Sequence, residues 1–352
     1  MKHKVAKGRG ATLQIGGRFE SARRERADDG WGSADEELPP FKTTVTVEQA
    51  RSVIQRNDSN DLSFSQSLNA YRGCEHGCIY CYARPSHGYL NLSPGLDFET
   101  KLFAKPDAAK LLRAELAKPS YRCAPIALGS NTDPYQPIER EWRITRQIIE
   151  VLAECRHPLS IITKSALIER DLDLLAQLAQ GNLVQVYISV TTLDVPLARK
   201  LEPRAASPRR RLQAMRTLNE AGVPCGVMVA PVIPFLTDAG LENVLQAAHE
   251  HGARSAGYSL LRLPYELKEL FEDWLATHYP LRAAHVMNRL REMRGGSDAG
   301  LGSFRRGNDQ FSGLLAQRFQ IACARLDFNL DEAPLDTRSF RPPSRTGQMV
   351  LF

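Results

Sequence analysis

Residues 69–82, NAYRGCEHGCIYCY, join a short strand pattern to a cysteine motif. We predict a strand over 69–73, followed by Cys74, Cys78 and Cys81 at the spacing C-x3-C-x2-C. A glycine precedes the first cysteine and another precedes the second, so the backbone can pass close to a bulky group. Three thiolates from one short loop suit a [4Fe–4S] cluster in which one iron has no protein ligand. Such an open iron favours a reactive or substrate-binding role over electron transfer alone.

Two alternatives exist for the same cysteines. A structural zinc site needs four ligands, commonly from two CxxC-type pairs, and its fourth ligand here would be His76, His87 or a distant cysteine. A redox disulfide between Cys78 and Cys81 would leave Cys74 unexplained. The cluster interpretation uses all three cysteines and needs no fourth residue.

Outward from this loop, short β-branched runs alternate with helical patterns. Strands are predicted at 69–73, 125–130, 159–164, 183–191, 223–232 and 254–262. Helices are predicted at 107–117, 141–155, 171–180, 207–221 and 240–251, and then at 264–277, 281–294 and 311–323. Six strand–helix units predict an α/β fold, a partial (β/α)6 parallel barrel with a helical C-terminal extension. A doubly wound open sheet is the alternative, because periodicity does not determine strand order.

Composition and charge set the predicted domain boundaries. Residues 1–40 are polar and aperiodic, which predicts a mobile, disordered leader. The barrel should occupy 41–265 and the helical extension 266–340. Residues 341–352 should form a flexible tail, because they are rich in Pro and Gly and lie at the chain end.

The composition also excludes several classes of protein. The chain has 352 residues, with 46 Lys and Arg against 40 Asp and Glu, and this net charge of +6 permits an anionic partner without requiring one. Seven cysteines over this length do not make a disulfide scaffold. The start MKHKVAKGRG lacks the apolar segment of a secretory signal, and no apolar run approaches the roughly 18 residues of a membrane span. We therefore expect a cytoplasmic protein without membrane contact.

Polar residues follow the predicted strands, at the edge where parallel α/β folds bind their ligands. Besides the cysteine loop, these residues are Ser130, Asn131, Thr132, Asp133, Thr163, Lys164, Thr191, Thr192, Pro231, Pro234 and Arg262. Ser189 and Thr191 alternate at the end of the fourth strand and therefore share one face. We expect a ligand site at this edge, although turn chemistry also explains the Asn and Asp before Pro134.

The cysteine spacing, with an aromatic residue before the last cysteine and six parallel units, resembles the radical S-adenosylmethionine (SAM) superfamily. Within it, four segments resemble the spore photoproduct lyase-related branch: CEHGCIYCYARPSH (74–87), DPYQPIE (133–139), SVTTLD (189–194) and LEPR (201–204). The resemblance spans residues 65–265.

This resemblance implies a [4Fe–4S] cluster held by Cys74, Cys78 and Cys81, with the amino and carboxylate groups of SAM on the fourth iron. A single electron, from a donor of flavodoxin or ferredoxin type, would cleave SAM to a 5′-deoxyadenosyl radical that abstracts hydrogen. The residues expected to contact the cofactor are Tyr80, Ser130, Asn131, Thr132, Asp133, Lys164, Ser189, Thr191, Glu202, Arg204 and Pro231. The structural alternatives are a core tyrosine for Tyr80, a snorkelling rim lysine for Lys164 and a surface ion pair for Glu202 with Arg204.

One feature departs from spore photoproduct lyases. In those enzymes, a cysteine in the loop after the second strand donates a hydrogen atom to the repaired thymine. Here that loop reads GSNTDPYQ (129–136), and Cys123 precedes the strand. Literal photoproduct lyase activity is therefore not expected, and a shared scaffold does not determine the substrate.

Arginine runs indicate nucleic acid as the substrate class, because arginine binds phosphate in bidentate geometry. They lie at 209–211, at Arg289, Arg291 and Arg294, and at 305–306. A solvated helical face is the alternative explanation. We predict damaged or modified DNA as the substrate. The other candidates are radical modification of RNA, protein or a small molecule, or a non-catalytic nucleic-acid-binding protein with a structural zinc.

The chain ends in Gln-Met-Val-Leu-Phe, residues 348–352. This terminus resembles the pentapeptide by which bacterial replication and repair proteins bind the DNA sliding clamp. Gln348 would form hydrogen bonds, while Leu351 and Phe352 would fill an apolar pocket. A tail that folds back onto the core is the alternative.

Overall fold

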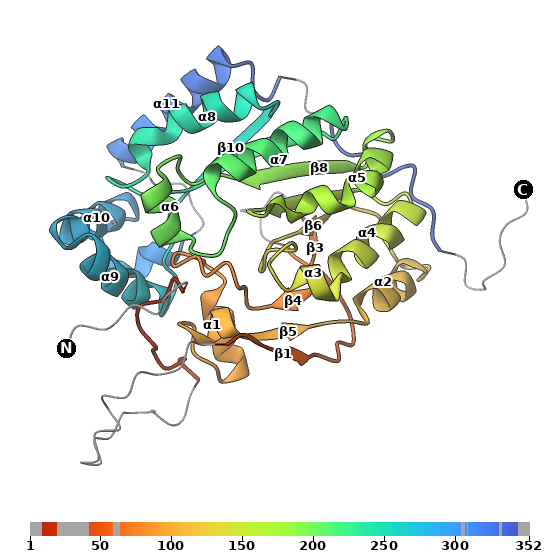
Figure 1. The fold of residues 1–352 in the computed structure, drawn as a ribbon, viewed down its shortest axis with the longest axis horizontal. Helices are drawn as coiled ribbons and strands as arrows, with labels where there is room; N and C mark the ends of the chain where they lie inside the picture. Colours follow the sequence, from red (N-terminus) through yellow and green to blue (C-terminus); the bar gives the residue numbers. More distant parts are fainter. Residues whose placement is uncertain are drawn as a thin grey trace, which may run out of the picture.

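The computed structural model describes residues 9–19, 42–58, 64–303, 307, 309–330 and 333–343. Its centre is a seven-stranded sheet in the order β10-β9-β8-β7-β6-β3-β2 (Figure 1). The strands are β2 (Ile54–Arg56), β3 (Gln66–Leu68), β6 (Ile126–Leu128), β7 (Leu159–Thr163), β8 (Val184–Ser189), β9 (Cys225–Val232) and β10 (Ser255–Leu260). Neighbouring strands from β3 to β10 are parallel, whereas β2 is antiparallel to β3.

The strand order decides between the two predicted architectures. The strands from β3 to β10 lie side by side in sequence order, without the reversal that creates the switch point of a doubly wound sheet. The predicted partial (β/α)6 barrel is therefore confirmed.

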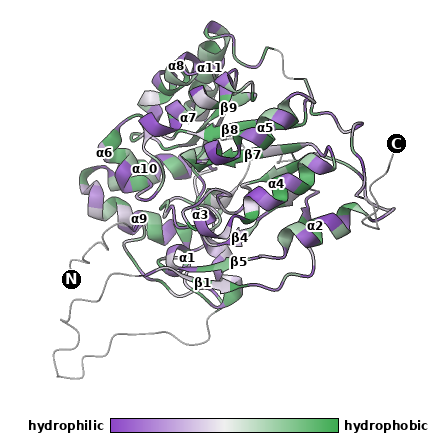
Figure 2. Cartoon of the chain, turned by 45° about the vertical axis from the view of Figure 1, so that its right-hand side comes forward, coloured by the Kyte–Doolittle hydropathy of each residue, from purple (hydrophilic) through white to green (hydrophobic). Residues whose placement is uncertain are grey.

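Helices cover the outer face of this sheet and bury their apolar stripes on it. They are α2 (Ala108–Leu116), α4 (Ile144–Glu154), α5 (Leu172–Ala179), α7 (Pro208–Glu220) and α8 (Leu241–Glu250). The short helix α6 (Val195–Leu201) belongs to a separate apolar cluster. Ile148 and Leu152 of α4, for example, belong to the same buried cluster as Ile161 of β7. Figure 2 shows helices of mixed hydropathy around the sheet. The helix predicted over 207–221 begins as expected, because the Ser207 side chain accepts a hydrogen bond from the Arg210 amide at 3.3 Å.

The prediction of the first strand at 69–73 is wrong. The barrel strand is β3, and Tyr71–Arg72 instead form β4, which pairs antiparallel with β5 (Lys101–Ala104). Together with β1 (Thr44–Val47) they make a second sheet, β1-β5-β4. Gln66 of β3 is polar but buried, and its amide donates to the Arg122 carbonyl at 3.0 Å. A hydropathy pattern does not predict this strand, because it assigns polar residues such as Gln66 to the surface, whereas Gln66 is buried and hydrogen-bonded.

The helix predicted over 141–155 is broken into two pieces. Glu139–Trp142 form the short helix α3, and α4 begins at Ile144. Between them Arg143 adopts a left-handed conformation with φ of 51°. A left-handed residue cannot continue a right-handed helix, and the side chain of Arg143 gives no sequence signal for the break.

Residues 9–19 contact the core, so the mobile leader predicted over 1–40 is wrong for this part. The amides of Gly10 and Ala11 donate to the Glu99 carboxylate at 3.0 and 2.8 Å, and Ala11 is only 1% exposed. The remainder of the predicted leader lies outside the described residues.

The C-terminal extension contains the helices α9 (Leu267–His278), α10 (Pro280–Met293) and α11 (Gln310–Arg325). Helices α9 and α10 form a second apolar cluster with Leu197 and Leu201 of α6. Beyond α11, the chain returns to the barrel, and the Arg341 amide donates to the Cys155 carbonyl at 2.8 Å. Residues 344–352, which include Gln348, Leu351 and Phe352, lie outside the described residues. In the described part of the chain, no helix has the length and apolar character needed to cross a membrane.

A buried ion pair joins the N-terminal segment to the cysteine loop. Arg84 contacts Glu99 at 2.5 Å, and both side chains are 0% exposed. Arg84 also donates to the carbonyls of Cys78, Pro94 and Gly95 at 2.9 to 3.1 Å. Each of the three guanidinium nitrogens therefore has at least one hydrogen-bond acceptor, as a buried charge requires.

We expect Arg84→Leu to lower the free energy of unfolding by about 3–5 kcal/mol, because it removes the ion-pair partner of the buried Glu99 carboxylate. Urea unfolding of the anaerobically purified protein measures this effect. The control is Arg113→Leu, which breaks the exposed pair with Glu154 and should cost less than about 1 kcal/mol. Equal losses in the two variants would contradict the role assigned to Arg84.

Candidate cofactor site

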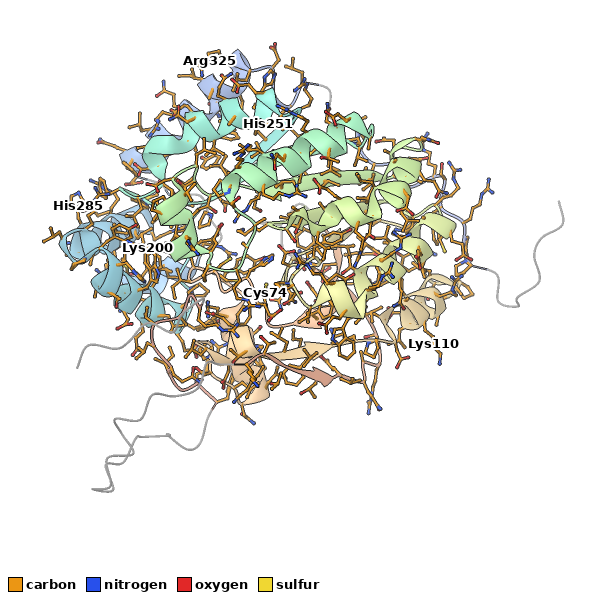
Figure 3. The ribbon with its side chains drawn as sticks, viewed as in Figure 1. Cys74, Lys110, Lys200, His251, His285 and Arg325 are labelled. Carbon is orange, nitrogen blue, oxygen red and sulfur yellow. The ribbon has the colours of Figure 1, made fainter. Side chains whose placement is uncertain are left out.

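The cysteine loop lies between β4 and the short helix η1 (Arg84–Leu90), at the carboxyl edge of the barrel. Cys74 and Cys78 are 7% and 9% exposed, Cys81 is partly exposed, and all three are free thiols. Two backbone hydrogen bonds hold the loop, from Cys74 to the Phe98 carbonyl and from Ile79 to the Leu201 carbonyl. Figure 3 shows Cys74 near the middle of the view, whereas Lys110, His285 and Arg325 lie toward the periphery.

Both glycines of the loop are required by the backbone and by packing. Gly73 and Gly77 have φ values of +75° and +66°, a backbone region that residues other than glycine rarely adopt. A Cβ on Gly73 would lie 2.7 Å from the Leu102 side chain, and one on Gly77 would lie 2.8 Å from the Glu99 carboxylate. The atoms that approach these glycines are therefore protein atoms.

Gln136 and Arg204 attach the loop to the barrel. The Glu75 amide donates to the Gln136 side chain at 2.9 Å, and the Gln136 amide group donates to the Gly73 carbonyl at 3.2 Å. Arg204 forms an ion pair with Glu75 at 3.1 Å, and its backbone amide donates to the His76 carbonyl. Arg204 thus contacts the loop through Glu75.

Asp133, just after β6, links the loop to β7. Its carboxylate accepts hydrogen bonds from the Thr163 hydroxyl at 2.6 Å and the Lys164 amide at 2.8 Å, and lies 3.3 Å from His76 Nδ1. Burial alone would raise the pKa of Asp133, but His76 and the two hydrogen bonds outweigh it and hold the pKa at about 2. Asp133 is therefore an anion at neutral pH.

Asn69 organises the turn that contains Ser130, Asn131 and Thr132. The Asn69 side chain donates to Ser130 Oγ at 3.1 Å and accepts from the Asn131 and Thr132 amides at 3.0 and 3.3 Å. Turn chemistry therefore accounts for the backbone of this segment. The Thr132 hydroxyl is buried without a hydrogen-bond partner in the described ranges.

Glu202 is the centre of a buried hydrogen-bond network. It accepts hydrogen bonds from the Tyr80 hydroxyl and the Arg211 guanidinium, and from the Thr191 hydroxyl at 2.6 Å. Burial by itself would raise the pKa of Glu202, but the positive charges of Arg211 and Lys164 bring it down to about 2. The alternative of a surface ion pair between Glu202 and Arg204 is wrong, because Glu202 is 3% exposed and pairs with Arg211.

The other predicted cofactor contacts border this network. The Ser189 carbonyl accepts from Arg211 at 2.9 Å, and the Thr191 oxygen, whose hydrogen is directed to Glu202, lies 2.9 Å from the carbonyl oxygen of Ala230, the residue before Pro231. Lys164 Nζ lies 5.7 Å from the centre of the Tyr80 ring. The structure thus brings together Tyr80, Lys164, Thr191 and Glu202, while Asp133 and Arg204 act on the cysteine loop.

The donor set fits an iron–sulfur cluster. Three thiols from one loop are present without a disulfide, and two of them, Cys74 and Cys78, are buried. Burial raises the pKa of Cys78 to about 12, while the charge of Lys164 acts in the opposite direction. Among the described residues, no group of three or more His, Cys, Asp or Glu side chains is arranged around one metal-ion position.

Sequence reasoning missed the buried groups that hold the predicted ones in place, namely Asn69, Arg84, Glu99 and Gln136. The signals available for them were the positions of Arg84 inside the segment 74–87 and of Gln136 inside the segment 133–139. Arg211 was interpreted as part of a phosphate-binding run, which is wrong, because it is buried against Glu202.

Most of the other predicted arginines pair within the protein. Arg289 contacts Glu292 at 2.8 Å, and Arg291 contacts Asp298 at 2.6 Å. Arg294 donates to the Leu261 carbonyl at 3.2 Å. The arginines of this second run therefore form contacts within the protein, at α10 and its C-terminal end. The third run, residues 305–306, lies outside the described residues.

Comparison with known proteins identifies the family. Residues 68–248 match the Radical SAM superfamily, so this chain belongs to that superfamily and is an enzyme of the radical SAM type. Uncharacterized proteins of Mycobacterium tuberculosis and Mycobacterium bovis are 42% identical over 234 residues, which is 66% of this chain and 68% of theirs. An uncharacterized protein of Methanocaldococcus jannaschii is 31% identical over 171 residues, 49% of this chain and 61% of its own.

Solved structures of spore photoproduct lyase share the fold. One, complexed with dinucleoside spore photoproduct, has a TM-score of 0.57 at 16% identity and covers 80% of this chain and 79% of that one. A second, a mutant with bound AdoMet and the same photoproduct, has the same TM-score, identity and coverage. The spore photoproduct lyase-like architecture predicted from the sequence is thereby confirmed.

The pKa of Glu202 predicts a dependence of stability on pH. Because folding lowers this pKa from 4.5 to about 2, the ionised carboxylate stabilises the fold fully above about pH 5 and progressively less as pH falls toward 2. We therefore expect the difference in unfolding free energy between wild type and Glu202→Gln to shrink over that interval. Urea unfolding at several pH values measures the difference, and a pH-independent difference would contradict the assigned ionisation.

Proposed function

We propose that Cys74, Cys78 and Cys81 bind a [4Fe–4S] cluster, that SAM binds its fourth iron, and that the enzyme abstracts hydrogen from damaged or modified DNA. The observation that carries the proposal is the set of three free thiols in one buried loop at the carboxyl edge of a radical SAM barrel. Bound together, cluster and SAM would supply a 5′-deoxyadenosyl radical.

The chain's own residues would orient the cofactor and exclude water. The loop is held from one side by Arg84 with Glu99 and from the other by Gln136. Tyr80 is held by Glu202, so its ring has a defined position near Lys164. Ser130, Asn131, Thr132, Ser189, Thr191 and Pro231 remain proposed contacts of SAM. A dry, ordered site of this kind protects a reactive radical from side reactions.

Membership of the radical SAM superfamily favours the cluster over a structural zinc. His76, a candidate fourth zinc ligand, directs Nδ1 to Asp133, and His87 Nε2 lies 2.9 Å from the Lys101 carbonyl. Both histidines therefore have one ring nitrogen engaged by other groups.

Two observations support DNA as the substrate. The structural neighbours include an enzyme complexed with a dinucleoside photoproduct. In addition, residues 348–352 resemble the pentapeptide by which replication and repair proteins bind the sliding clamp. The lack of a cysteine in the loop at 129–136 argues for a reaction other than literal photoproduct reversal. An electron donor of flavodoxin or ferredoxin type and a sliding clamp, the latter bound through Gln348, Leu351 and Phe352, are the proposed partners. Radical modification of RNA, protein or a small molecule is the alternative outcome.

We expect anaerobically purified protein to contain about four irons per chain and to cleave SAM reductively to 5′-deoxyadenosine. Cys78→Ala should lose the cluster absorbance and this activity. The control, Cys225→Ala, removes a buried thiol from β9 and should retain both. One zinc per wild-type chain, without iron or SAM cleavage, would overturn the cluster proposal.

The substrate proposal is tested by isotope transfer. We expect deuterium from uniformly deuterated, ultraviolet-irradiated DNA to appear in 5′-deoxyadenosine, because the radical would take hydrogen from the substrate. Two controls should transfer little deuterium. One is deuterated DNA that has not been irradiated, and the other is deuterated RNA irradiated in the same way as the substrate DNA. Transfer from RNA, or none from DNA while SAM is still cleaved, would refute DNA as the substrate.

A further inference from the structure

A cleft of about 520 Å³ opens beside the cysteine loop. Its walls come from four segments that follow barrel strands or the cysteine loop. They are His76 of the loop, residues 135–140 up to α3, residues 165–170 around η2 (Ala166–Asp171), and the segment from Arg204 to Arg210 in the first turn of α7. The cleft therefore lies at the same edge of the barrel as the proposed cofactor site.

Arginines dominate the charged side chains that line this cleft: Arg140, Arg170, Arg204 and Arg210, together with Glu169. Three of them already have carboxylate partners, because Arg170 pairs with Glu139 and Asp171, Arg204 with Glu75, and Arg210 with Glu169. Arg140 is exposed and makes no ion pair or side-chain hydrogen bond with any residue that the structure describes. The side chains of Arg204 and Arg210 are 38% and 42% exposed, so solvent and ligands can reach them.

Existing ion pairs position these arginines without using all their donors. Arg204 contacts Glu75 through one nitrogen, and Arg210 contacts Glu169 through its two terminal nitrogens. A guanidinium carries five N–H donors in a rigid plane. Donors therefore remain for a second anion, and the paired carboxylates restrict where each guanidinium lies. Planar, preordered donors of this kind suit phosphate oxygens.

We propose that this cleft binds the phosphodiester backbone of a single-stranded or locally opened nucleic-acid substrate next to the radical site. The proposal rests on the proposed function, because it assigns the phosphate contacts of the same DNA substrate. His76 lines the cleft and lies between Cys74 and Cys78, so a strand held there passes the cysteine loop. Extrusion of the target nucleotide would then place it at the site while its neighbours stay in the cleft.

The test uses the cluster-loaded enzyme and a fluorescent single-stranded DNA oligonucleotide, with binding followed by anisotropy at several salt concentrations. We expect Arg140→Gln combined with Arg210→Gln to weaken binding roughly tenfold and to reduce the slope of log K against log salt by about 1.4, or about 0.7 per lost phosphate contact. Arg140→Gln alone, which breaks no ion pair within the described residues, should produce part of both effects.

The matched control combines Arg209→Gln with Arg216→Gln, the same change of charge on exposed positions of α7 outside the cleft. It should change affinity much less. Equal weakening by control and cleft variants, or wild-type protein that does not bind the oligonucleotide, would overturn the proposal. So would wild-type protein that binds inorganic pyrophosphate but not the oligonucleotide, because this result would identify a small phosphate compound as the occupant.

Two parallel measurements separate this inference from the proposed function. All variants should cleave SAM in the absence of DNA at the wild-type rate, because none of the four substituted positions belongs to the proposed cofactor site. If deuterium transfer from DNA occurs but the cleft variants bind normally, only the cleft assignment fails. If transfer does not occur but the cleft variants lose DNA binding, the assigned reaction fails and the cleft assignment stands.

Discussion

The structure depends on burying two arginine–glutamate pairs around one cysteine loop. Removing an ion from water costs several kcal/mol, and the attraction between partners repays this only when the remaining donors and acceptors are also satisfied. Arg84 meets this condition through Glu99 and three carbonyls, and Arg211 meets it through Glu202 and the carbonyls of Ser189 and Ala206. Arg84 holds the cysteine loop through the Cys78 carbonyl, and Arg211 holds Glu202, which in turn accepts a hydrogen bond from Tyr80 of the loop. The two pairs therefore connect the loop to the barrel.

This arrangement has a chemical consequence for the site. The pKa values of Asp133 and Glu202 are both about 2, so both carboxylates are anions at neutral pH and neither has a proton to donate. Their oxygens are engaged by protein donors, which makes them positioning groups for the cysteine loop, for Lys164 and for Tyr80. Acid–base catalysis by these residues is therefore not expected, in agreement with the proposed abstraction of a hydrogen atom.

Local patterns in the sequence predicted much of the fold, and the failures have identifiable causes. The strand near 159–164 and the cap at Ser207 were recognised because hydropathy and capping act between residues close in sequence. The first barrel strand was displaced because Gln66 is buried through a hydrogen bond to a distant carbonyl. Residues 9–19 were assigned to the leader because their anchor, Glu99, lies about ninety positions away.

By itself, the sequence determined the cysteine spacing, the alternation of strands and helices, and the clustering of polar residues after strands. These features follow from the covalent order of the chain and from contacts over a few residues. Only the tertiary structure decided the strand order, the pairing of Arg211 with Glu202 and the basic cleft beside His76. The reason is that an arginine has the same local signature whether it is buried against a carboxylate or faces an open cleft. Long-range packing alone selects between these two environments.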